Sequence, residues 1–120
     1  MAAKLYIAGK ITGDPDYRSR FGIAAEAYRK KGYVVLNPAR LPEGMQKADY
    51  MRICFAMIDT ADAVAFLPGY ETSSGALLEL QYCRYTGKDV KLPEPGAEAE
   101  GLSDEGPCVR HFYSRFCVRS

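Results

Sequence analysis

The 120-residue sequence predicts an α/β fold: a three-layer sandwich in which helices cover both faces of a mostly parallel sheet of four or five strands. Short apolar runs alternate with longer amphipathic ones in the order βαβαβαβ, and the connections are short, which favours right-handed crossovers between parallel strands. Two polar loops that contain glycine, residues 9–15 and 68–75, each follow an apolar run. Ligands of such sheets bind beyond the carboxyl ends of the strands, so we expect these two loops to line one pocket.

The first half of the chain is predicted to contain two strands and the helix between them. Residues 4–8 are apolar and precede a loop with two glycines and a proline, as expected where a strand ends. Over residues 17–31 apolar side chains recur at helical spacing between charged ones, and Gly32 ends this amphipathic helix. Residues 33–36 are apolar again, and the Asn-Pro pair after them turns the chain into a loop that runs to about residue 46.

The second half of the chain repeats this pattern. A helix is predicted over residues 48–60, with Met51, Phe55 and Ile58 on its inner face and Cys54 as a further candidate for it. Residues 62–67 form an apolar run bounded by turn formers, as a buried strand should. The last predicted elements are a helix at 74–85 and a strand at 89–92.

Composition and charge limit the classes of function. The chain is long enough for one core and too short for two ordinary domains, and its 48% hydrophobic and 26% charged residues are typical of a globular protein. A net charge of +1 gives no electrostatic footprint for nucleic acid or for an acidic membrane surface. Since no apolar run approaches the roughly twenty residues that span a bilayer, we expect a cytoplasmic protein without nucleic-acid or membrane partners.

The cysteines and the single histidine, His111, offer little for a metal site. Cys54, Cys83, Cys108 and Cys117 are widely spaced, with no CxxC pair. Cys54 and Cys83 fall in predicted helices among apolar neighbours, where cysteine acts as a small hydrophobe. Cys108 and Cys117 could pair, but in a reducing compartment we expect thiols. The sequence therefore predicts no metal.

The composition changes at residue 93. We divide the chain into a domain at residues 1–92 and a linker with a C-terminal extension at 93–120. Residues 109–119 alternate well enough to form a strand or a segment that docks on the domain or on a neighbouring subunit. Docking is favoured over nucleic-acid binding, because the three arginines there are not accompanied by a wider basic surface.

The loop after the third strand carries the residues best suited to chemistry. Ser73, Ser74 and Gly75 supply hydroxyls, a helix N-cap and close backbone approach, and Glu79 follows about one helical turn later, on the face that looks back toward the loop. A carboxylate above such a helix N-terminus can bind and attack a sugar. The alternative is that Ser74 only caps the helix and Glu79 is a solvated surface residue.

Four motifs, in this order and spacing, resemble the nucleoside 2-deoxyribosyltransferase-like superfamily: residues 6–9, 32–38, 61–64 and 73–79. The resemblance covers residues 4 to about 91 and is closest to DUF4406, a small subgroup that is often phage-associated. It implies a Rossmann-like, flavodoxin-like α/β fold, a homodimer or larger oligomer, a nucleoside or nucleotide as small-molecule partner, and no cofactor.

The resemblance also implies roles for individual residues. Glu79 matches the glutamate that attacks the anomeric carbon of a 2-deoxynucleoside or its monophosphate. Gly75 matches the glycine four positions before it, and Ser73 matches a residue that contacts the sugar or phosphate. Gly9 and Gly13 match glycines of the first loop.

The chemistry agrees with this assignment. Cleavage passes through an oxocarbenium-like state, so an ionised carboxylate can both stabilise the positive charge and form a covalent intermediate. Tyr6, in the first strand, could orient that carboxylate by a hydrogen bond. Ser74 and Gly69 complete the residues that we expect at the substrate.

This chain departs from the superfamily at two positions. Relatives carry an aspartate seven residues before the position of Ala61, where this chain has Cys54. Asp59 either approaches the substrate from the helix end or is a solvated carboxylate. Relatives that hydrolyse nucleotides carry an arginine in the first loop, where this chain has Thr12. Lys10 either replaces that charge or is a surface lysine.

Three hypotheses follow. The first is an enzyme that transfers or hydrolyses the N-glycosidic bond of a nucleoside or nucleotide. The second is a protein that binds a nucleotide or an ADP-ribose-like ligand without turnover, favoured by the missing aspartate. The third is a structural phage protein that retains only the fold. A dinucleotide oxidoreductase is not indicated, because no GxGxxG follows the first strand.

Overall fold

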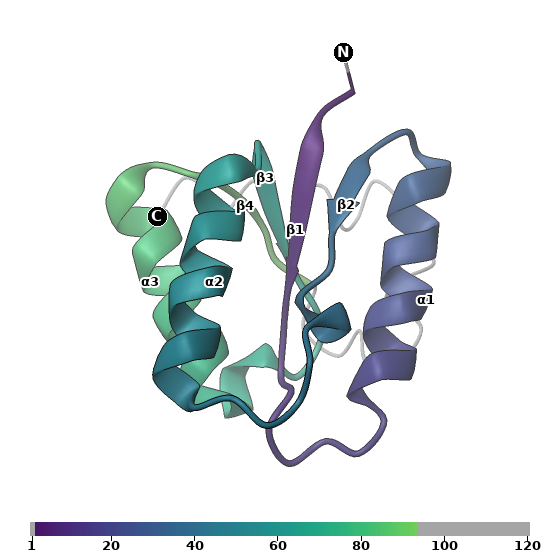
Figure 1. Cartoon of the computed structure of the whole chain (residues 1–120). Helices are drawn as coiled ribbons and strands as arrows, with labels where there is room; N and C mark the ends of the chain where they lie inside the picture. The colour runs from purple at the N-terminus through teal and green to yellow at the C-terminus, as the bar shows by residue number, and fades with distance from the viewer. Residues whose placement is uncertain (1, 94–120) are drawn as a thin grey trace.

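A computed structural model describes residues 2–93, which form a parallel four-stranded sheet with helices on both faces (Figure 1). Its elements are β1 (Lys4–Ala8), α1 (Tyr17–Lys30), β2 (Val34–Leu36), η1 (Pro38–Arg40), α2 (Lys47–Thr60), β3 (Ala63–Phe66), η2 (Tyr70–Thr72), α3 (Ser74–Thr86) and β4 (Asp89–Lys91). The predictions for the linker and extension, including Cys108, His111 and Cys117, concern residues outside the described part of the chain.

Every strand and α-helix expected within residues 2–93 is present, and its ends agree to within one residue. The sequence did not predict the 3-10 helices η1 and η2, which lie in the expected loops. A single 3-10 turn leaves no periodicity in a sequence, so only a proline or glycine at its start marks it. Here η1 begins at Pro38, and Gly69 precedes η2.

The strand order places β1 at the centre of the sheet. The order is β2-β1-β3-β4, and all neighbours run parallel, which is the flavodoxin-like arrangement. The chain leaves β1 for one side to form β2 and crosses to the other side to form β3, so the strand order reverses between β1 and β3. The loops that follow these two strands therefore start side by side at the carboxyl edge, as the alternation predicted.

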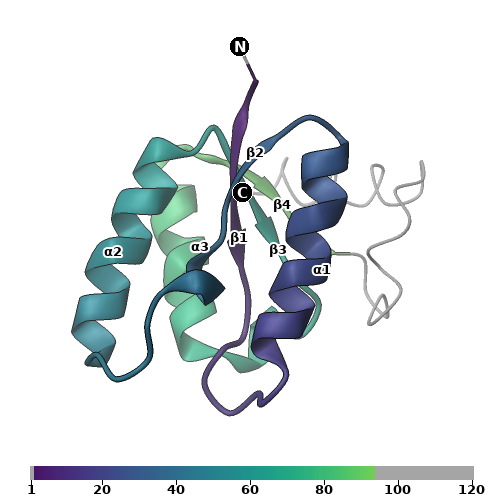
Figure 2. The same ribbon diagram turned by 45° about the vertical axis from the view of Figure 1, so that its right-hand side comes forward.

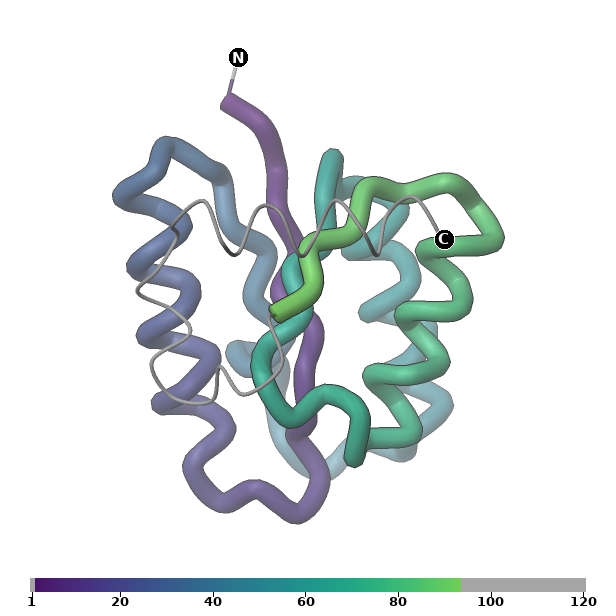
Figure 3. The backbone as a smooth tube through the Cα atoms, turned by 180° about the vertical axis from the view of Figure 1, so that it is seen from behind, coloured from purple at the N-terminus to yellow at the C-terminus, as the bar shows by residue number. Residues whose placement is uncertain are grey.

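The helices divide unequally between the two faces. One face is covered by α1, while α2 and α3 lie together on the other (Figures 1 and 2). Figure 3 shows the same division from behind, with α3 in front of α2. Together with the sheet they make the three layers that the sequence predicted. No helix in the described residues is long and apolar enough to cross a membrane.

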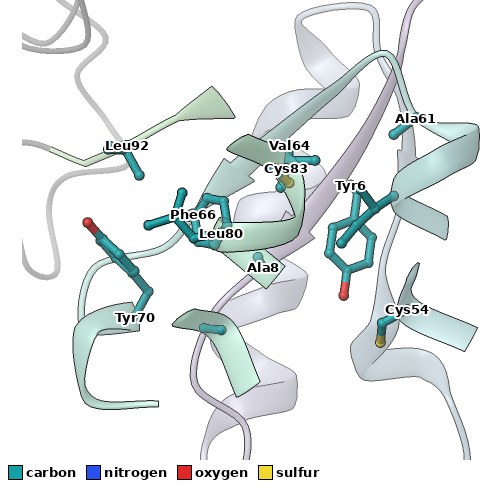
Figure 4. Close-up of a cluster of buried hydrophobic side chains, with 12 residues drawn as sticks. Tyr6, Ala8, Cys54, Ala61, Val64, Phe66, Tyr70, Leu80, Cys83 and Leu92 are labelled. Carbon is teal, nitrogen blue, oxygen red and sulfur yellow. The ribbon is translucent and has the colours of Figure 1, made fainter. Parts of the chain in front are cut away.

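Alternate residues of β1 serve two separate cores, because side chains of a strand point to opposite faces. Leu5 and Ile7 pack with Phe21 on the α1 side. Tyr6 and Ala8 face the other way, into the cluster beneath α2 and α3 (Figure 4). A tyrosine hydroxyl thus enters an interior that is otherwise largely apolar.

The ends of α3 are set by two residues. The Ser73 hydroxyl accepts a hydrogen bond from the Ala76 backbone N–H at 3.2 Å and caps the helix, so the interpretation of Ser74 as the cap is wrong by one position. Gly87 ends the helix with φ of 79°, a left-handed conformation that favours glycine.

Gly22 of α1 provides a test of helix stability. Its φ is not positive, its surface is exposed, and an added Cβ would meet no atom within 4 Å. Gly22→Ala should therefore raise the free energy of unfolding by about 0.5–1 kcal/mol, measured by urea denaturation. The matched Gly87→Ala should lower it by roughly 1–2 kcal/mol, because alanine must adopt a left-handed conformation there. Equal effects of the two substitutions would contradict this account of both helices.

Candidate functional site

A hydrogen bond joins Tyr6 and Glu79 inside the protein. The Tyr6 hydroxyl donates to Oε2 of Glu79 at 3.0 Å. Tyr6 is 1% exposed and Glu79 is 6% exposed, and Glu79 is the one buried charged residue within residues 2–93. The alternative in which Glu79 is a solvated surface residue is therefore wrong, and the hydrogen bond expected from Tyr6 is present.

Glu79 occupies a position in α3 that would ordinarily be apolar. Its neighbours at helical spacing, Ala76, Leu80 and Cys83, are all buried against the sheet. A carboxyl group placed in such a row is costly unless it is hydrogen-bonded. The Tyr6 hydroxyl supplies one such hydrogen bond. It reaches Glu79 because Tyr6 points from β1 toward the face of the sheet that α3 covers.

Burial shifts the proton affinity of this site. Loss of solvent raises the pKa of Glu79 to about 7, while hydrogen bonds from Tyr6 and Cys54 act in the opposite direction. Burial and the nearby carboxylate of Glu79 hold the pKa of Tyr6 well above its usual range, so its hydroxyl remains a donor. At neutral pH the carboxyl group therefore holds its proton far more often than an exposed glutamate does.

Cys54 of α2 belongs to the same buried cluster. It is 6% exposed, and the Tyr6 hydroxyl points toward it (Figure 4). Burial raises the pKa of the Cys54 thiol to about 11, so it is neutral at physiological pH. The sequence predicted Cys54 among apolar neighbours in a helix and marked it as a departure from relatives, but did not place it at the site. The signal that could have assigned Cys54 to the site was its position seven residues before Ala61, where relatives carry an aspartate.

The first-loop glycines allow a tight approach between the two predicted loops. A Cβ on Gly9 would lie 3.2 Å from both Leu67 Cβ and Phe21 Cζ, so a side chain at Gly9 would press on the start of the other loop. Gly13 has φ of 85°, which favours glycine. Lys10 is half-buried and forms no ion pair with any residue described, and Thr12 is exposed.

The second loop brings Ser73 and Gly75 to the start of α3. Gly69 has φ of 91° and leads into η2. Ser73 and Gly75 are half-buried, and Ser74 is exposed. A Cβ on Gly75 would lie 3.7 Å from Met51 Cε, so this turn of α3 packs closely on α2.

Asp59 lies apart from the other candidates. It is exposed near the end of α2, where its Oδ1 accepts a hydrogen bond from the Tyr82 hydroxyl at 2.7 Å. Because α2 runs from the carboxyl edge of the sheet to the amino edge, Asp59 is near the edge opposite the two loops. The structure thus brings together Tyr6, Cys54 and Glu79 but not Asp59.

Comparisons with known proteins agree with this architecture. The family model described as "Domain of unknown function (DUF4406)" matches residues 3–92. A solved structure described as 2-desoxiribosyltransferase from Leishmania mexicana is similar, with a TM-score of 0.61, 22% identity, and coverage of 88% of this chain and 79% of that chain. At this identity the likeness shows the fold. No curated protein matches the chain. Residues 2–93 contain no group of three or more His, Cys, Asp or Glu that could hold a metal.

Buried Glu79 should make stability depend on pH. Its pKa when folded, about 7, lies above the ordinary value of 4.5, so the folded state holds the proton more tightly. The contribution of this group is therefore greatest at acid pH and falls as pH rises from 4.5 through 7, by about 3 kcal/mol in total. Relative to wild type, Glu79→Gln should gain up to about that amount in unfolding free energy between pH 4 and pH 8.

Urea denaturation across this pH range measures the difference. Glu71→Gln is the matched control, because Glu71 is exposed in η2 and should show no such trend. If the difference in unfolding free energy between Glu79→Gln and wild type stays constant across this pH range, the account of a buried, proton-binding carboxyl group is wrong.

Proposed function

Because this chain belongs to the DUF4406 family and shares its fold with a protein described as a deoxyribosyltransferase, we propose that it is an enzyme that breaks the N-glycosidic bond of a nucleoside or nucleotide. Glu79 is the proposed nucleophile. The observation that supports this most is the buried carboxyl group, hydrogen-bonded to Tyr6 and presented from a helix that starts at the carboxyl edge of the sheet. A charged side chain in a core position is costly to stability, and catalysis is a reason for a protein to carry it.

The proposed reaction has two steps. In the first, an oxygen of the Glu79 carboxylate bonds to the anomeric carbon of the sugar as the bond from that carbon to the base nitrogen breaks. The electron pair of the broken bond leaves with the base, which takes up a proton. In the second, water or another base attacks the same carbon and loses a proton, and the bond from that carbon to the carboxylate oxygen breaks. The proton lost in the second step balances the one that the departing base takes up in the first. The surrounding low-dielectric interior strengthens the attraction between the carboxylate and the developing positive charge.

Tyr6 is the proposed positioning residue. Its hydroxyl donates to Oε2 of Glu79, and we assign the attack on the sugar to Oε1. The same hydrogen bond lowers the pKa of Glu79 against the effect of burial, and so increases the fraction of reactive carboxylate.

The two loops are the proposed walls of the substrate site. Gly9 and Gly13 let the first loop pass close to the substrate, and Lys10 is a charge within that loop with no ion pair among the described residues. Ser73 and Ser74 add hydroxyls at the amino end of α3, where the helix dipole favours an anionic group such as a 5′-phosphate.

We also propose that the chain acts as a homodimer or larger oligomer in the cytoplasm. Leu77, Leu78 and Tyr85 of α3 are apolar side chains that remain 38%, 45% and 92% exposed, and a partner subunit would remove that surface from water.

A second candidate is a protein that binds the nucleotide without cleaving it. The observation that favours it is Cys54, a neutral thiol at the position where relatives carry an aspartate. A thiol is a weak hydrogen-bond partner, so it would hold a nucleobase less firmly for reaction than a carboxylate does.

The first prediction of this proposal is release of free base. Deoxynucleosides and their 5′-monophosphates are incubated with the protein, and liberated base is measured by chromatography. Glu79→Ala should reduce the rate by about a thousandfold or more, because it removes the nucleophile, while Glu71→Ala should not change it. Equal release by wild type and Glu79→Ala would end the proposal. Calorimetric binding with the ligand recovered intact would favour the second candidate.

The second prediction concerns pH. The rate should rise with pH through about 7, because the ionised form of Glu79 is the nucleophile. Tyr6→Phe removes a hydrogen bond that lowers the pKa of Glu79, so the rising limb should shift to higher pH by on the order of one unit. Tyr28→Phe, on the other side of the sheet, is the control and should leave the profile unchanged. If Tyr6→Phe lowers the rate but leaves the rising limb at the same pH, the Tyr6 hydroxyl does not lower the pKa of Glu79.

A further inference from the structure

A second candidate site lies on the other side of the sheet from Glu79. A cavity of about 290 Å³ lies between α1 and η1, which are in contact. Three arginines line it: Arg18 and Arg29 of α1 and Arg40 of η1. No aspartate or glutamate is among its lining residues. The cavity is therefore electropositive on several sides.

The floor of this cavity is made of small residues. Gly22 and Ala25 lie between Arg18 and Arg29 on one face of α1, at spacings of four, three and four residues, and Ala39 faces them from η1. A Cβ added at Gly22 would meet no atom within 4 Å, so the space above it is open. This face of α1 therefore has small side chains at its centre and an arginine at each end, which leaves room for an anion between two cations.

The three guanidinium groups differ in how many protein partners they already have. Arg40 forms no side-chain hydrogen bond or ion pair with any residue from 2 to 93. Arg18 donates from Nε to the Tyr17 hydroxyl at 3.0 Å and from Nη2 to the Leu41 carbonyl at 3.3 Å, so a ligand has to share or replace these partners. Arg18 also pairs with Glu43 at 3.6 Å and Arg29 with Glu26 at 3.4 Å, and the two arginine side chains are 53% and 46% exposed. Exposed pairs of this kind contribute little and are exchanged readily for a better anion.

Asn37 adds a neutral donor to the same cavity. Its Oδ1 accepts a hydrogen bond from the Ala39 backbone N–H at 2.9 Å, which fixes the side chain where β2 ends. The amide nitrogen of that side chain then offers two further N–H groups beside the arginines. The donors come from α1, η1 and the end of β2, so a bound anion would be held from several directions.

We propose that this cavity binds a small anion with two or more linked phosphate groups. Guanidinium groups match the oxygens of phosphate in a fork geometry and bind them bidentately. The Cα atoms of Arg18 and Arg29 are separated by roughly 16 Å along the helix axis, too far for one phosphate to engage both side chains well. With two or three linked phosphates, each arginine can engage a different phosphate. The site is separate from Glu79, and its ligand is not the proposed substrate.

Calorimetry of the full chain with tripolyphosphate at low ionic strength tests the proposal. Arg40→Gln should weaken binding at least about tenfold, because it removes a charged donor from the cavity. Gly22→Leu should weaken it at least as much without changing the charge, because the side chain fills the open space. Arg84→Gln removes the same charge from an exposed position on α3 and is the matched control, with binding unchanged.

Other measurements separate this site from its alternatives. Inorganic phosphate should bind at least about tenfold more weakly than tripolyphosphate, since it engages fewer arginines. Glu79→Ala should bind tripolyphosphate as tightly as wild type, whether or not Glu79 proves to be catalytic. The proposal is overturned if wild type does not bind tripolyphosphate, if inorganic phosphate binds as tightly, if Arg84→Gln weakens binding as much as Arg40→Gln, or if Gly22→Leu folds and binds normally. If Gly22→Leu does not fold, the comparison of Arg40→Gln with Arg84→Gln still tests the proposal.

Discussion

The hydrogen bond between Tyr6 and Glu79 connects the central strand to the last helix through the interior of the protein. Its two ends are 73 residues apart in the sequence, so it can form only after the sheet and both crossovers are in place. The bond is also what makes the buried carboxyl group tolerable, since an unpaired carboxyl group in that position would cost several times the net value of one hydrogen bond. Stability and proposed chemistry therefore rest on the same pair of side chains.

The sheet order explains why the two loops meet where they do. With β1 at the centre and β3 beside it, Ala8 pairs with Phe66, and the Leu67 N–H donates to the Ala8 carbonyl at 2.8 Å. The next residue of each strand leads directly into a loop. Gly9 keeps the first loop close to Leu67, and Ser73 fixes the start of α3 after the second. The backbone pairing of β1 with β3 therefore brings together the two loops of the proposed substrate site.

Much of this arrangement could be predicted from the sequence, because hydrophobic periodicity and turn residues mark the elements. The spacing of Glu79 behind the loop placed it on the face that looks back toward the loop, with a solvated position as the alternative. Tyr6 was named as a residue that could donate a hydrogen bond to it from the first strand. The sequence predicted Cys54 among apolar neighbours, but its contact with Tyr6 could not be derived, because that contact depends on how α2 packs across β1. The helix cap was misplaced from Ser73 to Ser74, since adjacent serines differ only in backbone conformation, which sequence does not show.

The central position of β1 also bears on how the protein is made. Lys4–Ala8 precedes both of its partner strands along the chain, β2 at residues 34–36 and β3 at residues 63–66. During translation its apolar residues therefore lack their strand partners until β3 has emerged from the ribosome, and unpaired apolar segments invite aggregation. The nascent chain is accordingly most vulnerable in that interval, when chaperones that hold exposed strands would have their greatest effect on its yield.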